Sequence, residues 1–90
     1  MLIKALTCTP LPRARLKLGF SDGTEGVVDL SALLESEGEM VAPLREPAYF
    51  DRVFLEAGAP TWPNGFDLAP WALHAELKAA GQLEAASQNA

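Results

Sequence analysis

The chain has 90 residues, 49% hydrophobic and 21% charged, a composition typical of one folded domain rather than a disordered segment. Cys8 is the single cysteine, which excludes an intrachain disulfide and favours a reducing compartment such as the cytoplasm. The longest stretch without a charged side chain has ten residues, Ala57 to Phe66, whereas a membrane span needs about 20. We therefore expect a small cytoplasmic domain without a transmembrane helix.

The net charge of −5 is unevenly distributed along the chain. Residues 1–21 hold four basic side chains and no acidic one, whereas residues 22–90 hold three basic and twelve acidic side chains. Overall acidity disfavours non-specific binding to nucleic acid or anionic lipid. It is compatible with a basic partner protein.

The first third of the chain predicts three strands. Residues 2–8 favour a strand, and residues 9–12 a turn, because two prolines cannot serve inside a ladder. Residues 13–20 alternate between basic and apolar side chains, the clearest strand pattern in the chain. A three-residue loop at 21–23, with a left-handed glycine, then pairs this strand with residues 24–29. That register places Leu16 opposite Val28, Leu18 opposite Gly26, and Arg15 opposite Asp29.

The remaining two thirds predict shorter elements. A helix over residues 32–35 is expected to be capped by Asp29 or Ser31 and to end at Gly38. Residues 39–46 are predicted to be irregular, and Pro47 to open one or two helical turns through Phe50. Residues 52–57 predict a fourth strand, 60–62 a short edge strand and 63–65 a turn. Asp67 or Ala69 is expected to cap a final helix that buries Leu73 and Leu77 on one face.

The resulting order is β-β-β-α-β-β-α. It indicates an α+β fold, an antiparallel sheet of four to five strands with short helices packed on one face. We expect one domain over residues 1–81 and a flexible tail over residues 82–90.

Three turn motifs follow one another at characteristic spacing. The hairpin Phe20-x-Asp22-Gly23 leads into Val28-Asp29-Leu30, then come Leu44-x-x-Pro47-x-x-Phe50 and Trp62-Pro63-Asn64-Gly65-x-Asp67-Leu68. The chain thereby resembles, over roughly residues 2–75, the small bacterial family called domain of unknown function 2442. The resemblance implies a small α+β domain without assigned catalytic residues. It also implies gene pairs with another small protein, an arrangement that resembles toxin–antitoxin pairs.

Trp62, Asn64 and Asp67 form the best candidate for a ligand or partner site. An aromatic side chain beside an amide and a carboxylate can hold a peptide or a small polar ligand. The alternative is structural, in which Trp62 fills the core, Asn64 belongs to a turn and Asp67 caps the last helix.

Arg13, Arg15 and Lys17 form a candidate basic patch. Such a stripe on one strand face can contact phosphates. The alternative is a solvated face neutralised by Glu25 and Asp29, and the stripe lacks the aromatic side chains of single-strand binders.

No catalytic constellation accompanies these candidates in the sequence. His74 has no nucleophile placed beside it, Cys8 has no histidine beside it, and one Cys with one His is too few for a zinc site. We therefore predict neither catalytic residues, metal nor cofactor. The sequence favours a non-enzymatic interaction or regulatory module, either monomeric or homodimeric. The more specific form of this hypothesis is an antitoxin-like partner of a small companion protein. The alternative is a nucleic-acid-binding accessory protein that uses the basic patch.

Overall fold

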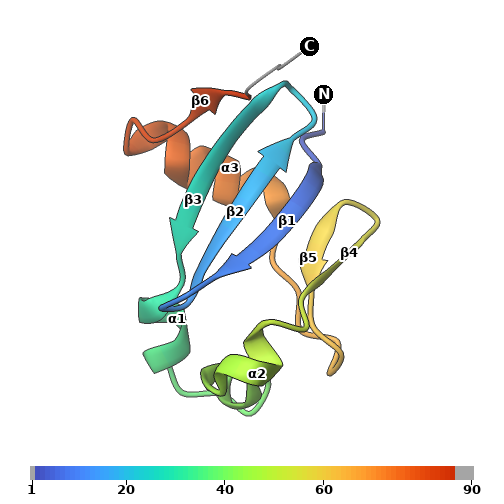
Figure 1. Ribbon diagram of the computed structural model, residues 1–90, viewed down its shortest axis with the longest axis vertical. Coiled ribbons are helices and arrows are strands. Elements are labelled where there is room, and N and C mark those ends of the chain that lie inside the picture. Colours follow the sequence, from blue (N-terminus) through green and yellow to red (C-terminus); the bar gives the residue numbers. More distant parts are fainter. Residues whose placement is uncertain (1, 87–90) are drawn as a thin grey trace.

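The computed structural model describes residues 2–86 and divides the strands between two antiparallel sheets (Figure 1). The larger sheet has the order β1-β2-β3-β6, and the smaller pairs β4 with β5. The α+β class predicted from the sequence is confirmed, although the strands form two sheets rather than one. The elements are β1 (Ala5–Leu11), β2 (Arg15–Phe20), β3 (Thr24–Asp29), α1 (Ser31–Glu35), the 3₁₀ helix η1 (Ala42–Arg45), α2 (Pro47–Phe50), β4 (Phe54–Glu56), β5 (Ala59–Thr61), α3 (Pro70–Ala79) and β6 (Glu84–Ala85).

The β2–β3 hairpin has the predicted register. Leu16 pairs with Val28, Leu18 with Gly26, and Arg15 with Asp29. The loop closes as expected, since Gly23 has φ = 86° and its N–H donates to the Phe20 carbonyl at 3.1 Å. The strict alternation of apolar side chains fixed this register, because a slip of one residue would move them to the other face.

The β1–β2 hairpin differs from the prediction. β1 begins later and extends through Pro10 to Leu11, where a turn was expected, and Pro10 pairs with Leu16. β1 is the outermost strand of its sheet, a position that tolerates a residue without an N–H. The tight reversal follows instead at Arg13 and Ala14, which have φ of 67° and 59°.

Short helices occupy the connection from β3 to β4. Leu30 takes the cap position of α1, while the Asp29 carboxylate accepts the Ser31 N–H at 2.8 Å. Residues 42–45 form the turn η1 where an irregular segment was predicted, because Pro43 suits the start of a helical turn. Pro47 opens α2 as predicted, and α2 ends at Phe50.

The β4–β5 hairpin docks beside the start of β1. The Ala5 N–H donates to the Gly58 carbonyl at 2.8 Å. Gly58 has φ = 81°, and a Cβ built there would lie 2.8 Å from the Cβ of Lys4. This close approach requires glycine for two independent reasons, the backbone angle and the space.

α3 covers one face of the large sheet (Figure 1). It starts at Pro70 with Ala69 at its cap position, and no side chain caps it, so Asp67 is not the cap. Past Gly81 the chain does not fray at once, because Thr24 pairs with Ala85 in β6 and the Ala86 N–H donates to the Gly23 carbonyl at 2.8 Å. The rest of the expected tail, residues 87–90, lies outside the described residues.

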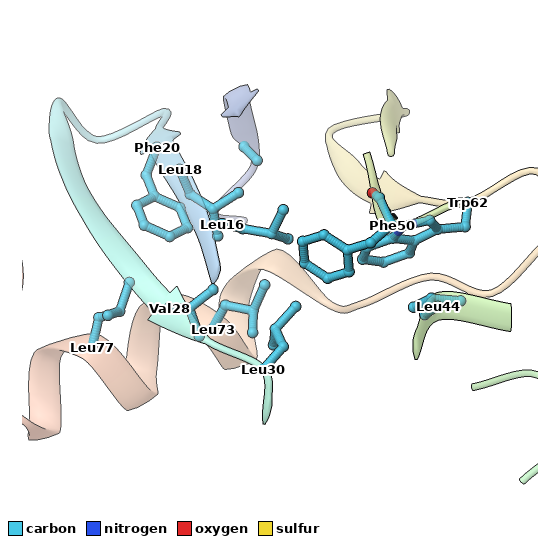
Figure 2. Packing of buried hydrophobic residues seen from close by; sticks show 11 residues of the cluster. Leu16, Leu18, Phe20, Val28, Leu30, Leu44, Phe50, Trp62, Leu73 and Leu77 are labelled. Carbon is cyan, nitrogen blue, oxygen red and sulfur yellow. Dashed lines mark hydrogen bonds between the residues drawn. The ribbon is translucent and has the colours of Figure 1, made fainter. Parts of the chain in front are cut away.

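One hydrophobic core joins the two sheets and the helices. Figure 2 shows Leu73 and Leu77 of α3 facing the sheet, and Phe50 and Trp62 next to each other near Leu44. The Phe50 and Trp62 ring centroids lie 5.7 Å apart. The buried members are Ala5, Leu16, Leu18, Phe20, Val28, Leu30, Leu44, Phe50, Trp62, Leu73 and Leu77.

Candidate functional site: an apolar groove beside the β1–β2 hairpin

Trp62, expected as an aromatic platform, lies inside the core with 0% of its surface exposed. Its indole Nε1–H donates to the Phe50 carbonyl at 3.0 Å, and its ring packs 6.0 Å from the centroid of Phe66. No ligand reaches an indole in this position without displacing core side chains. The arrangement agrees with the structural alternative for Trp62.

Asn64 and Asp67 serve the same loop in different ways. The Asn64 side-chain amide donates to the Met40 carbonyl at 2.9 Å, and its oxygen accepts the Phe66 N–H at 3.1 Å. Asp67 is exposed and forms an isolated bridge with Thr61. Asn64 thus ties two loops together, while Trp62 is buried and Asp67 lies at the surface.

The three basic candidates do not form one stripe. Arg13 lies in the left-handed turn, whereas Arg15 and Lys17 lie on β2. The Arg15 Nε–H donates to the Pro12 carbonyl at 3.0 Å, and Lys17 Nζ lies 3.6 Å from a Glu25 carboxylate oxygen. The positive charge of this face is therefore partly balanced within the chain.

Arg15 also lies across the strands from Asp29. Hydrogen bonds from Ser31 and, to a smaller extent, the charge of Arg15 hold the pKa of the Asp29 carboxyl below its ordinary value. This carboxylate is ionised at neutral pH and faces the arginine, as expected for a neutralised strand face.

His74 pairs with a residue that sequence reasoning did not connect to it. Its Nε2 lies 2.8 Å from Oδ2 of Asp22, and its ring meets the Phe20 ring edge-on at 5.1 Å between centroids. The other Asp22 oxygen accepts the Thr24 hydroxyl at 2.6 Å, and these contacts lower the pKa of the Asp22 carboxyl. The pair joins α3 to the β2–β3 loop.

Cys8 is a poor nucleophile in this fold. It is half-buried against the core, and burial raises the pKa of its thiol to about 11. The thiolate is the reactive form of cysteine, so little of it exists at neutral pH.

A further hollow of the described surface lies at the end of the large sheet, where the β1–β2 hairpin meets α1, η1 and α2. It is a groove of about 830 Å³ with a mainly apolar lining. Leu44 and Phe50, both buried, lie at its base. Its lining residues are Pro10, Leu11, Pro12, Arg13, Ala14, Ser31, Leu34, Glu35, Leu44, Arg45, Pro47, Phe50 and Asp51.

Charged side chains of both signs line this groove. Arg45 is held in place because its Nε–H donates to the Leu34 carbonyl at 2.5 Å and its Nη2–H to the Ser36 carbonyl at 2.7 Å. It thereby joins η1 to the last turn of α1. Glu35 and Asp51 stand on the helical side, where residues 30–51 contain five acidic side chains and one basic, a net charge of −4.

One motif in the sequence belongs to this groove, although the sequence alone indicates only a turn there. Leu44, Pro47 and Phe50, spaced three residues apart, all line it. The opposite wall, Pro10 to Ala14, could not be assigned to the same site, because its neighbours across the groove lie 17 or more positions away in the sequence.

Within residues 2–86, no three His, Cys, Asp or Glu side chains gather in a way that could hold a metal ion. Among the helices of that same part of the chain, none is long and apolar enough to cross a membrane.

Comparisons with known proteins give one match. Neither the curated proteins nor the solved structures include a significant match to this chain. A family model described as "Protein of unknown function (DUF2442)" matches residues 7–79, which span the groove, the core except Ala5, and all of α3. This match covers most of the chain, and it confirms the resemblance seen in the turn motifs. The chain belongs to the DUF2442 family.

Proposed function

We propose that this chain is a non-enzymatic interaction module that binds a segment of a partner protein in the groove between the β1–β2 hairpin and α1–η1–α2. The observation that carries the proposal is the groove itself, about 830 Å³ with a mainly apolar lining. Concave apolar surfaces of this size with a few polar groups are typical binding sites. The occupant is a partner segment with large apolar side chains and basic neighbours.

The charge of the helical wall supports the basic character of the partner. Residues 30–51 carry a net charge of −4. Of the four charged lining residues, Glu35 and Asp51 are acidic, Arg45 already donates to two carbonyls, and Arg13 lies on the opposite wall. Complementary charge raises the rate of association and disfavours acidic competitors. An antitoxin-like role, in which the chain neutralises a small companion protein, is the finer form of this proposal.

Nucleic-acid binding has less support. Lys17 faces Glu25 at 3.6 Å, Arg15 lies opposite Asp29, and Arg13 belongs to a turn. A phosphate would compete with carboxylates for the strand pair, and the overall charge of −5 opposes its approach.

Selection from a random peptide library on the immobilised protein tests the proposal. Leu11 lines the groove, and it is not one of the described side chains that pack against the core, so Leu11→Asp alters the groove without opening the core. Leu6→Asp, an equivalent change on the same strand at an exposed site, is the matched control. We expect enriched peptides with large apolar and basic residues that bind the wild type and Leu6→Asp but not Leu11→Asp.

Either of two results would contradict the proposal. If the library yields no enrichment over bare support, or if the enriched peptides bind Leu11→Asp as tightly as the wild type, the groove is not the binding site.

A further inference from the structure

The backbone of the groove walls limits the conformation of an occupant. On the hairpin side, Pro10 and Pro12 have no N–H to offer. At the other end of the same strand, the Ala5 N–H is already bonded to Gly58. The edge of β1 beside the groove is therefore a poor template for adding a strand, because strand addition depends on alternating donors and acceptors.

The helical side offers equally few free backbone groups. The N–H of Leu34 donates to the Leu30 carbonyl at 3.0 Å, that of Leu44 to Val41 at 2.9 Å and that of Phe50 to Glu46 at 2.9 Å. Pro47 has no N–H, and the Leu34 carbonyl accepts Arg45. At these positions the main-chain groups already bond to other groups of the chain, so the lining mainly offers side chains to an occupant.

An extended peptide would bring unpaired backbone groups into this mainly apolar groove. Each buried N–H or C=O without a partner costs about 1–3 kcal/mol. A helix satisfies its own backbone groups and presents only side chains, at positions i, i+3, i+4 and i+7. The groove can bury apolar side chains, but it offers few hydrogen-bond partners to the backbone of an occupant. A helix therefore fits it better than a strand.

We infer that the occupant is an amphipathic helix whose apolar face enters the groove and whose flanking residues are basic; this rests on the proposed function. Figure 1 shows α1 and α2 at the end of the large sheet, away from the face covered by α3. Lysine or arginine side chains beside the apolar face meet Glu35 and Asp51. Arg45 already donates to two carbonyls, so its contribution is to hold the wall in shape.

Three synthetic peptides of about 14 residues, roughly four helical turns, separate the alternatives. The first repeats the heptad Leu-Lys-Lys-Leu-Leu-Lys-Leu, whose leucines fall on one helical face. The second alternates Leu and Lys, the period of a strand. The third is the first with Glu in place of Lys. Titrations at physiological salt follow backbone amide shifts of the wild-type protein, Leu11→Asp and Leu6→Asp.

We expect the heptad Leu/Lys peptide to bind and to shift the amides of residues 11, 13, 14, 31–35, 44–46 and 48–51. Its affinity should fall about tenfold or more in Leu11→Asp, as for a central apolar contact, and stay within about twofold in Leu6→Asp. Both variants add the same negative charge, so general attraction for a cationic peptide changes equally in both.

Each other outcome overturns a separate statement. Tighter binding of the alternating peptide at the same amides would overturn the helix and leave the proposed function standing. Tighter binding of the Leu/Glu peptide would overturn the basic flanks. Shifts that avoid the groove, or equal losses in Leu11→Asp and Leu6→Asp, would overturn both the inference and the proposed function.

Discussion

At the scale of single residues, position in the fold decides which chemistry remains available. Trp62 is a candidate for contact with a ligand from its residue type, yet it is fully buried. The side-chain amide of Asn64 donates one hydrogen bond to a backbone carbonyl and accepts another from a backbone N–H. Among the accessible side chains of the groove, Arg13 stands out in the sequence only for its charge and Pro47 only as part of a turn motif.

The Cys8 thiol provides a prediction at this scale. Burial raises its pKa from 9.0 to about 11, so at neutral pH the folded protein should react with iodoacetamide about 100-fold more slowly than the urea-unfolded chain. Mass spectrometry of the alkylated protein over time measures both rates. Similar rates in the two states would show that the thiol is not protected.

The same pKa has a consequence for stability. The unfolded thiol ionises more readily than the folded one, so its contribution to stability is full below pH 9.0 and declines as the pH rises through about 11. Cys8→Ala should remove this alkaline decline, as seen in urea denaturation at a series of pH values.

At the scale of elements, local pattern and turn chemistry account for most of the structure. The β2–β3 hairpin follows from alternation and one glycine, and α2 follows from Pro47. The β1–β2 hairpin does not, because its reversal uses Arg13 and Ala14 with positive φ instead of the residues that usually adopt it. Such a conformation costs an ordinary side chain about 1–2 kcal/mol and must be stabilised by its surroundings.

Arg13→Gly should relieve this cost. Glycine removes about 1–2 kcal/mol of backbone strain from the folded state, and ordering its more flexible backbone costs about 0.5–1 kcal/mol. The free energy of unfolding should therefore rise by roughly 0.5–1 kcal/mol. Arg13→Ala removes the same charge and keeps the Cβ, so it should bring no such gain. Urea denaturation compares the two, and equal effects would locate the cause in the arginine side chain rather than in the backbone.

At the scale of the whole molecule, Trp62 links parts that the sheets keep separate. It follows β5 directly, donates to Phe50 at the end of α2 and belongs to the same core cluster as Leu73 and Leu77 of α3. Figure 2 shows these side chains in one continuous layer. The two sheets should therefore unfold together.

Trp62→Phe tests this cooperativity. It removes the indole N–H from the Phe50 carbonyl, which keeps the Val53 N–H at 3.3 Å, and it reduces the core volume. Together these changes should lower the free energy of unfolding by about 1–3 kcal/mol. In this variant Trp71, exposed on α3, is the one remaining tryptophan. The urea midpoint from its fluorescence should coincide with the midpoint from far-UV circular dichroism. If the urea midpoint from Trp71 fluorescence differs from the midpoint by circular dichroism, the protein unfolds as two separate units. Trp71→Phe, at a 58% exposed site, should change stability by less than about 0.5 kcal/mol.

The sequence by itself determined the hairpin register at Leu16 and Val28, the start of α2 at Pro47 and the buried face of α3, and its turn motifs indicated the family. These features depend on neighbours within a few positions or on one turn, where periodicity and backbone preference act directly. Only the tertiary structure decided that Pro10 belongs to a strand, since that depends on β1 lying at the edge of its sheet.

The separate β4–β5 sheet, the return of the chain to β3 as β6, and the groove were also decided at this level. The return as β6 joins segments about 60 positions apart, and the groove joins segments 17 or more positions apart. The β4–β5 hairpin is itself local, but it docks beside the start of β1, more than 50 positions away. The free energy that joins them comes from burying apolar surface, which has no direction and leaves no periodic mark in the sequence.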